Sequence, residues 1–405
     1  MSFMQEKILL LKGKVQHYAW GGYDFIPAWL GIENKEHQPF AEYWLGAHPL
    51  ASATVVTPNG ELSLQQLIAD YPQEFLSISA RQQFGELPYL MKILDVRDML
   101  SIQVHPTKEG AAMGFEKEES EGVLLGASER NYKDKNHKPE VMVALSDFWL
   151  LHGFLTKDKL KAVLLATPEF EGLSDVFADG DYKALYERVM NHPQTEVNHH
   201  LMPLVKREIE RKQKDETSKS EPGWWVAKLF ENDKEIEDID RGIYSIYFFN
   251  IVNVKEGEGV FQGAGLPHAY LEGQNAELMA NSDNVLRGGL TPKHIDVPEL
   301  MKHTSFEGIV PNVMKGEKIN ENEKGYPCPV PDFGIHKITL KKNEKLKAIT
   351  SSLEIWMVIK GSANIEGSNV LPVHKGQSFA VLPNEHFTII ANDDALLYKA
   401  FVPEA

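Results

Sequence analysis

The hydrophobic pattern changes its period twice along the chain. From about residue 7 to residue 154, short apolar runs alternate with Gly and Pro, which predicts strands joined by turns, with one helix near Leu62–Asp70. Between about 157 and 233, apolar residues recur at helical spacing. Strands are predicted again over Tyr244–Val254 and from about 326 to 405. This order restricts the chain to a mainly β fold with a helical insert.

The 405 residues exceed the size at which one hydrophobic core usually keeps growing, so several domains are expected. We predict a first β barrel that begins in residues 1–154 and is completed by residues 241–320. A helical insert, 155–240, separates the two parts, and a second small barrel follows over 321–405. Within the insert, the polar segment Glu210–Pro222 is predicted to be an exposed linker.

Composition excludes several classes of partner and site. The formal charge of -16 argues against nucleic acid or an anionic membrane as a partner, but a small phosphorylated molecule needs only a few local cations. Cys328 is the only cysteine, so an intrachain disulfide cannot form, and a metal would be held mainly by other side chains. The apolar run Ile8–Leu11 is too short for a signal peptide. A cytoplasmic protein is expected.

Two short segments carry residues typical of a metal site. In Ser101–Pro106, Gln103 and His105 are two positions apart, so on a strand their side chains point to the same face. In the segment NHKPE, Glu140 lies just before an apolar strand, where a carboxylate is costly unless it is paired or binds a metal. Each segment alone also fits a structural role, either a hydrogen-bonded histidine or a charged loop.

A third histidine and a basic loop follow later in the chain. His268 comes after a glycine-rich turn at the start of a predicted strand. Together with Gln103, His105 and Glu140 it would supply nitrogen and oxygen donors suited to Zn²⁺. The loop 281–293 contains Arg287 and Lys293, which could bind phosphate or an enediolate oxygen, although such a loop could also simply be solvated.

These segments carry a family resemblance. The runs SIQVHP, NHKPE, PHAY and SDNVLRGGLTPKHIDV occur in this order, and YAWGG and AEYWLGAHP precede them. In these segments, across roughly residues 7 to 300, the chain resembles the type I mannose-6-phosphate isomerases of the cupin superfamily. The resemblance implies two cupin (jelly-roll) barrels plus a helical domain. It also implies one Zn²⁺ per chain and isomerisation of mannose 6-phosphate to fructose 6-phosphate through a cis-enediolate, which feeds mannose and GDP-mannose metabolism.

The resemblance also assigns roles to individual residues. It implies that zinc is bound by four residues: Gln103, His105, Glu140 and His268. Arg287 would be the catalytic arginine, with three groups near the reacting carbons: Lys138, His137 and Asp283. Six further residues are implied to line the substrate pocket: Ser101, Lys92, Glu42, Glu277, Tyr270 and Lys293. Which group takes the proton stays open among Lys138, Asp283 and His137.

The C-terminal segment departs from the metal-binding pattern. Glu354 and Gly361 resemble the end of a cupin motif, but the paired histidines expected upstream are missing. We therefore predict a structural, metal-free second barrel. Separately, we expect a monomeric enzyme that acts on a hexose phosphate. Two other functions stay open: a different cupin metalloenzyme, such as an Fe²⁺ oxygenase, and a sugar-binding or regulatory module without turnover.

The acidic segment 107–135 is expected to be either a solvated helix or a lid over the site.

Overall fold

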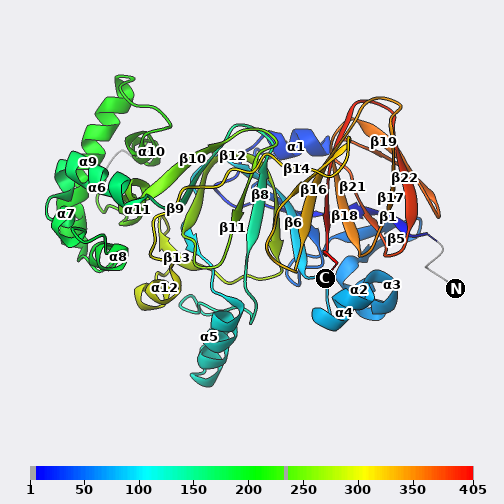
Figure 1. The fold of residues 1–405 in the computed structure, drawn as a ribbon, viewed down its shortest axis with the longest axis horizontal. Helices are drawn as coiled ribbons and strands as arrows, with labels where there is room; N and C mark the ends of the chain where they lie inside the picture. Colours follow the sequence, from blue (N-terminus) through cyan, green and yellow to red (C-terminus); the bar gives the residue numbers. More distant parts are fainter. Residues whose placement is uncertain (1–5, 232–235, 405) are drawn as a thin grey trace.

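The computed structural model describes residues 6–231 and 236–404. Its strands form sheets of ten, nine and four members, and their ladders are antiparallel. A group of helices lies at one end of the molecule and the C-terminal strands lie at the other (Figure 1). The predicted mainly β fold with a helical insert is therefore confirmed.

The ten-stranded sheet contains all the segments in which metal ligands were predicted. His268 begins its central strand, β12, Glu140 begins β8, and Gln103 lies in β7. The strands are β2 (Lys14–Gln16), β3 (Glu42–Gly46), β6 (Tyr89–Val96), β7 (Ile102–Val104), β8 (Glu140–Ala144), β9 (Phe148–Phe154), β10 (Phe249–Val254), β11 (Gly259–Gln262), β12 (His268–Ala280) and β13 (Leu286–Gly289).

The long strand β12 bends strongly. Strands β8 and β9 follow one another along one side of it, and β6 and β7 along the other. The strand register places Glu140 opposite Met279, which is eleven positions beyond His268 on β12. In a straight strand, at about 3.3 Å per residue, Met279 and His268 would be ~36 Å apart. The Glu140 carboxylate nevertheless lies 3.2 Å from the His268 ring. The sheet must therefore fold back on itself.

A glycine permits this bend. The β9–β12 register shifts between Tyr270 and Glu272, and Gly273 follows at once with a φ of +123°, a region that residues with a Cβ rarely adopt. A Cβ on Gly273 would lie 2.7 Å from the carbonyl oxygen of Asp147. Both the backbone angle and the close packing therefore require glycine here.

The nine-stranded sheet joins the two ends of the chain. Strand β1 pairs with β21, with Ile8 opposite Val381, so the segment 1–154 contributes strands to two sheets. The members are β1 (Ile8–Lys12), β4 (Thr54–Thr57), β5 (Gly60–Ser63), β14 (Glu317–Lys318), β15 (Glu323–Tyr326), β16 (Gly334–Leu340), β18 (Glu354–Lys360), β21 (Ser378–Val381) and β23 (Ala395–Phe401). The four-stranded sheet contains β17 (Lys345–Ile349), β19 (Ser362–Glu366), β20 (Val370–His374) and β22 (His386–Ala391).

The helical insert packs around its own apolar core. Its helices are α6 (Lys157–Ala166), the 3₁₀ helix η2 (Pro168–Phe170), α7 (Leu173–Val176), α8 (Tyr182–Met190), α9 (Gln194–Gln213) and α10 (Pro222–Leu229). Leu185, Leu201 and Trp225 are fully buried where these helices meet. The helical periodicity of the sequence thus reflects burial of one face of each helix.

Two boundaries of the insert were predicted wrongly. Helix α9 continues to Gln213, so the start of the predicted linker Glu210–Pro222 is helical. Arg211 contributes to this, because it binds Glu208 at 2.8 Å and Glu221 at 2.9 Å.

The strand predicted from Tyr244 begins only at Phe249, after helix α11 (Gly242–Phe248). All seven α11 residues are buried, so the apolar run showed no helical period.

The remaining helices flank the sheets. They are α1 (Phe25–Leu30), α2 (Leu64–Asp70), α3 (Pro72–Phe75), α4 (Ile78–Gln83), α5 (Lys108–Ser120) and α12 (Val297–His303). Helix α2 confirms the helix predicted near Leu62–Asp70, and Ser63 caps it by accepting a hydrogen bond from the Gln66 amide. Helix α5, in the acidic segment, projects from the body (Figure 1). Its role as a lid stays a prediction.

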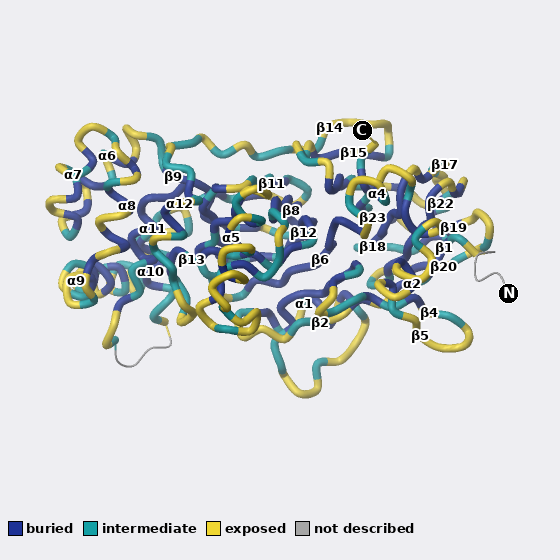
Figure 2. The backbone as a smooth tube through the Cα atoms, turned by 90° about the horizontal axis from the view of Figure 1, so that it is seen from below, coloured by how far each residue is buried: buried dark blue, intermediate teal, exposed yellow. Residues whose placement is uncertain are grey.

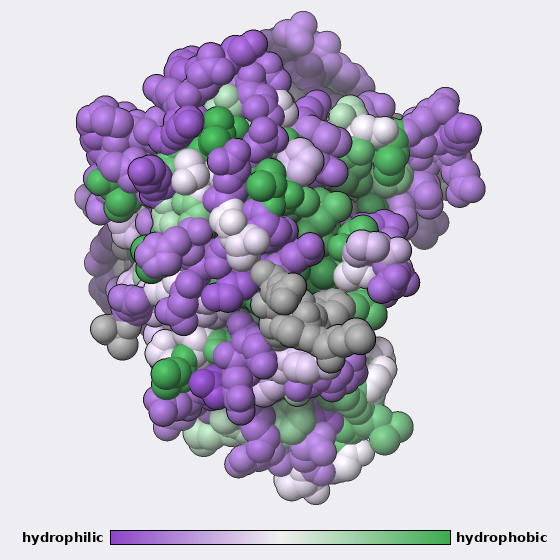
Figure 3. Space-filling model, turned by 90° about the vertical axis from the view of Figure 1, so that its right-hand side faces the viewer, coloured by the Kyte–Doolittle hydropathy of each residue, from purple (hydrophilic) through white to green (hydrophobic). Residues whose placement is uncertain are grey.

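The surface is polar around buried sheets. Figure 2 shows buried backbone along the central strands and exposed backbone in the outer loops and helices. The face at the end formed by the C-terminal strands is mainly hydrophilic, with separate hydrophobic groups (Figure 3). Exposed apolar side chains in these strands include Ile349 and Val370. Among the residues described, no helix has both the length and the apolar character needed to cross a membrane.

A charge cluster joins four strands of the nine-stranded sheet. Glu323 of β15 accepts a hydrogen bond from His336 of β16 at 2.6 Å, and Lys399 of β23 lies 3.2 Å from the same carboxylate. Lys399 also lies 3.4 Å from Glu354 of β18. Burial raises the pKa of Glu323, but His336 and Lys399 outweigh it and lower that pKa to about 2.

This cluster predicts an acid-sensitive part of the stability. A carboxyl group with a lowered folded-state pKa stabilises the fold above its unfolded pKa of about 4.3, and that contribution is lost as the pH falls toward 2. We expect Glu323→Gln to lower the free energy of unfolding by up to about 3 kcal/mol at pH 7 and much less at pH 3. Urea unfolding at both pH values measures this. A pH-independent gap would contradict it, and the exposed Glu61→Gln is the control.

The bend in β12 predicts an unequal response of two glycines. Gly273 and Gly60 have nearly equal φ values, +123° and +122°, but a Cβ on Gly60 would meet nothing within 4 Å. Gly60→Ala should therefore show only backbone strain, about 1–3 kcal/mol. Gly273→Ala adds a clash with Asp147 and should cost ~2 kcal/mol more, measured by urea unfolding. Equal losses would show that the bend does not depend on close packing at Gly273.

Candidate metal centre

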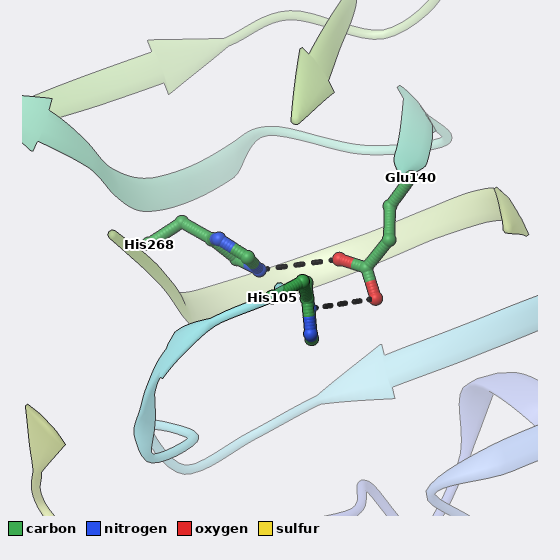
Figure 4. Close-up of side chains that lie close together, drawn as sticks. All are labelled: His105, Glu140 and His268. Atoms are coloured by element: carbon green, nitrogen blue, oxygen red, sulfur yellow. Dashed lines mark ion pairs between the residues drawn. The ribbon is translucent and has the colours of Figure 1, made fainter. Parts of the chain in front are cut away.

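Three of the four predicted ligands meet inside the folded sheet. The Glu140 carboxylate lies 3.4 Å from His105 Nε2 through Oε1 and 3.2 Å from His268 Nε2 through Oε2 (Figure 4). All three side chains are buried. They are the only group of three or more His, Cys, Asp or Glu side chains in 6–231 and 236–404 whose donor atoms lie within 4.8 Å of one another.

The backbone orients both imidazoles toward this centre. His105 Nδ1 lies 2.8 Å from the Asn284 carbonyl oxygen, and His268 Nδ1 lies 2.9 Å from that of Leu266. A carbonyl only accepts, so each Nδ1 carries the proton and each Nε2 keeps its lone pair. His105 Nε2 is buried and has no hydrogen-bond partner in the described part of the chain. A buried lone pair without a partner is what a metal ion would satisfy, so the residues fit a bound cation.

Electrostatics favours the protonation states that bind metals. Burial lowers the pKa of His105 to about 4, and the charge of Lys138 acts in the same direction, so the imidazole is neutral near pH 7. Burial opposes ionisation of Glu140, but Lys138 at 2.8 Å and the two histidines hold its pKa well below the usual value. A neutral imidazole and an ionised carboxylate are the forms that coordinate metals.

Strand register places Gln103 on the same face of the sheet as His268. It lies directly opposite His268 on β12 and directly opposite Arg287 on β13. Directly opposed residues in an antiparallel pair point to the same face, so the Gln103 side chain shares the inner face with His268. The same register places the half-buried Arg287 beside Gln103, and burial lowers the pKa of Arg287.

The other predicted catalytic residues have different neighbours. His48 lies 3.4 Å from Asp283. Burial raises the pKa of Asp283, but His48 and the charges of Lys138 and Lys92 outweigh burial and lower that pKa. His137 lies 3.0 Å from the buried Asp332. The loop that carries Asp283 is tied to the loop before β8 by a 2.8 Å hydrogen bond from the Asp283 amide to Asp134.

A buried charge network lies on the inner face of the same sheet. Lys92 is 3.3 Å from Glu42 and 3.4 Å from Glu277, and these two carboxylates raise its pKa although burial acts against them. The Tyr270 hydroxyl donates to Glu277 at 2.8 Å, and the Trp44 indole donates to Glu42. Four of the six predicted pocket residues therefore form one network.

The last two predicted pocket residues lie outside this network. Ser101 is half-buried just before β7. Lys293 is exposed, and partial desolvation of its ammonium, together with the charge of Arg287, lowers its pKa. Arg287 therefore lies close enough to Lys293 to affect its pKa.

Sequence reasoning missed several supporting residues. His48, which pairs with Asp283, lies in the AEYWLGAHP segment, where the resemblance gave it no role. Asp332, the partner of His137, lies in the C-terminal region without any motif. Asn284 was within a recognised segment, but only the structure shows that its backbone orients His105.

Comparison with known proteins decides the family. Residues 8–157 match the catalytic-domain model of type I phosphomannose isomerase. The chain is 35% identical over 391 residues to the mannose-6-phosphate isomerase of Escherichia coli K12, covering 93% of this chain and 95% of that protein. The chain belongs to the type I phosphomannose isomerase family. The family member from Macaca fascicularis is 31% identical over 442 residues, covering 97% of this chain and 98% of that one.

A solved member of the phosphomannose isomerase family has the same fold. The crystal structure of mannose 6-phosphate isomerase from Salmonella typhimurium, bound to its substrate fructose 6-phosphate and to zinc, superposes with a TM-score of 0.88. The two sequences are 31% identical, and the match covers 98% of this chain and 100% of that one.

The Lys92 network predicts a large loss of stability when its cation is removed. Lys92→Met leaves Glu42 and Glu277 buried without their shared positive partner. We expect the free energy of unfolding to fall by about 3–5 kcal/mol. The control is Lys255→Met, which removes an exposed pair with Asp147 and should cost less than ~1 kcal/mol. Urea unfolding measures both, and similar losses would refute the importance of burial.

Proposed function

We propose that this protein is a zinc-dependent mannose-6-phosphate isomerase that interconverts mannose 6-phosphate and fructose 6-phosphate. The observation that carries the proposal is the buried His105–Glu140–His268 triad, in which the His105 Nε2 lone pair has no partner among the described residues. Membership of the family supports the same activity, because its Escherichia coli and Salmonella typhimurium members bear that name.

Zinc would be held by Gln103, His105, Glu140 and His268. Two imidazoles, a carboxylate and an amide oxygen form a donor set that suits a redox-inactive ion. The two backbone carbonyls that accept from the Nδ1 atoms would fix the tautomers needed for binding. When bound, the ion would act as a Lewis acid that polarises substrate oxygens.

The charged residues around the triad would move protons and stabilise negative charge. The reaction transfers a proton between C1 and C2 through a cis-enediolate. Arg287 would stabilise that negative charge, because a guanidinium stays protonated and donates in a fixed fork. Lys138, Asp283 and His137 are the candidate bases; of these, Lys138 contacts the triad directly, at 2.8 Å from Glu140.

The pocket residues would bind the rest of the sugar phosphate. The network of Lys92, Glu42, Glu277 and Tyr270 presents donors and acceptors on the inner face of the sheet, as recognition of sugar hydroxyls requires. Ser101 and Lys293 would contact the phosphate end, where a hydroxyl and an ammonium are suitable donors.

We also propose the finer organisation predicted from sequence. The two β regions would each close into a cupin barrel, with 1–154 and 241–320 forming the catalytic one and 321–405 the second, to which β1, β4 and β5 of the first segment add strands. Residues 155–240 would form the helical domain. The protein would work as a cytoplasmic monomer.

The decisive experiment is an isomerase assay on the purified protein. Conversion of mannose 6-phosphate to fructose 6-phosphate is followed before chelation, after chelation, and after zinc is added back. We expect turnover that is lost on chelation and restored by zinc, because the donor set requires the ion. Metal-bound protein without turnover would instead favour a binding module, and oxygen consumption with Fe²⁺ would favour an oxygenase.

A matched variant controls for metal binding. Glu140→Gln keeps the size of the side chain but removes the charge between the two histidines, so zinc content and turnover should fall together. Full activity in this variant would exclude the triad as the zinc site. Lys255→Met, whose side chain lies on the surface, should leave both unchanged.

A further inference from the structure

Two buried polar side chains lie beside the triad without any role assigned to them. His152 of β9 is directly opposite His268 in the β9–β12 ladder, and Gln262 of β11 is directly opposite Glu140 in the β8–β11 ladder. Opposed residues in an antiparallel pair share a face. Both side chains therefore point to the same inner face as the triad.

Both side chains lie toward the same edge of the sheet. Strand β9 lies between β12 and β10, and β8 lies between β12 and β11. On this side of the His268–Glu140 contact, His152 of β9 lies next to His268 of β12. In the same way, Gln262 of β11 lies next to Glu140 of β8. The two residues thus extend the polar layer of the triad on the side away from β7, which carries Gln103.

The hydrogen-bonding capacity of these side chains is not used within the fold. Gln262 is fully buried and lies near the Tyr270 hydroxyl, but among the residues described neither its amide nitrogen nor its amide oxygen makes a hydrogen bond of good geometry. His152 is 4% exposed, and its Nδ1 likewise lacks one within the described ranges. Each unpaired buried group costs roughly 1–3 kcal/mol, so a pair beside a reaction centre indicates that a ligand supplies the partners.

A cavity reaches this edge from outside. It has a volume of about 810 Å³ and is lined by His152, by Phe261 next to Gln262, and by the segments 312–317 and 327–329. Within the first segment, Met314 pairs with Gly259 of β11, so the segment runs along the outer edge of the sheet (Figure 2). His152 therefore connects this space with the layer of the triad.

We propose that His152 and Gln262 form a subsite for hydroxyl groups of the open-chain sugar. An amide and an imidazole each offer a donor and an acceptor, which matches a hydroxyl group. Two uncharged hydrogen-bonding groups suit a hydroxyl better than a phosphate, which favours cationic partners. The subsite rests on the proposed isomerase function and adds residues that bind substrate on the far side of the triad from Arg287.

Binding of an inert substrate mimic tests the subsite. A hexitol 6-phosphate keeps the chain hydroxyls and the phosphate but has no carbonyl, so it binds without reacting. In the zinc-loaded protein, we expect His152→Leu and Gln262→Met each to weaken its binding about 3- to 10-fold, as loss of a neutral hydrogen bond does. Calorimetry measures this dissociation constant alongside that of inorganic phosphate, and zinc content is measured in parallel.

The controls separate this subsite from other roles. In the His152 and Gln262 variants, phosphate affinity and zinc content should stay at the wild-type level. The matched control is Ser378→Ala, which removes a buried unpaired hydroxyl from the C-terminal sheet and should leave hexitol binding unchanged. The shorter polar variants His152→Asn and Gln262→Asn guard against misfolding and should weaken hexitol binding in the same direction. Unchanged hexitol binding, or loss of zinc, would overturn the proposal. Wild-type protein without turnover would instead overturn the isomerase function.

Discussion

The contact between Glu140 and His268 is the constraint on which the site depends. The two residues are far apart along the sheet register, and they meet only because β12 bends back at Gly273. Strand β7 pairs with β12 at His268, so Gln103 lies beside this histidine. The metal centre is therefore a consequence of sheet curvature, which a single glycine with a positive φ allows.

Burial then determines the chemistry of this centre. Inside the folded sheet, two lysines lie beside buried carboxylates: Lys138 lies beside Glu140, and Lys92 lies between Glu42 and Glu277. Lys138 and the two histidines hold the pKa of Glu140 well below its usual value, whereas burial and the charge of Glu140 raise the pKa of Glu277. Polar atoms that stay unpaired in the described structure, such as His105 Nε2 and the Gln262 amide, lie in the same layer. We infer that metal and substrate supply the missing partners there.

Much of this arrangement could be predicted from local pattern, because alternation and helical spacing depend on which face is buried. The two-residue spacing of Gln103 and His105 and the position of Glu140 before an apolar strand both predicted donors to one cavity, and Figure 4 shows His105 and Glu140 together. Helix α11 was missed because a run buried on every side has no period. The pairing of β1 with β21 was missed because it joins residues about 370 positions apart, for which local pattern carries no signal. His152 and Gln262 were missed because they belong to no motif, and only register places them beside the triad.

X-ray absorption at the zinc edge of the zinc-loaded protein tests the central claim most directly, because it reports which atoms surround the ion. The account predicts one shell of nitrogen and oxygen donors at about 2.0–2.2 Å, with two imidazoles, from His105 and His268. A sulfur donor at about 2.3 Å, which only Cys328 or a methionine could supply, would contradict it. A third imidazole would also contradict it, because His152 would then be a ligand and not part of a hydroxyl subsite.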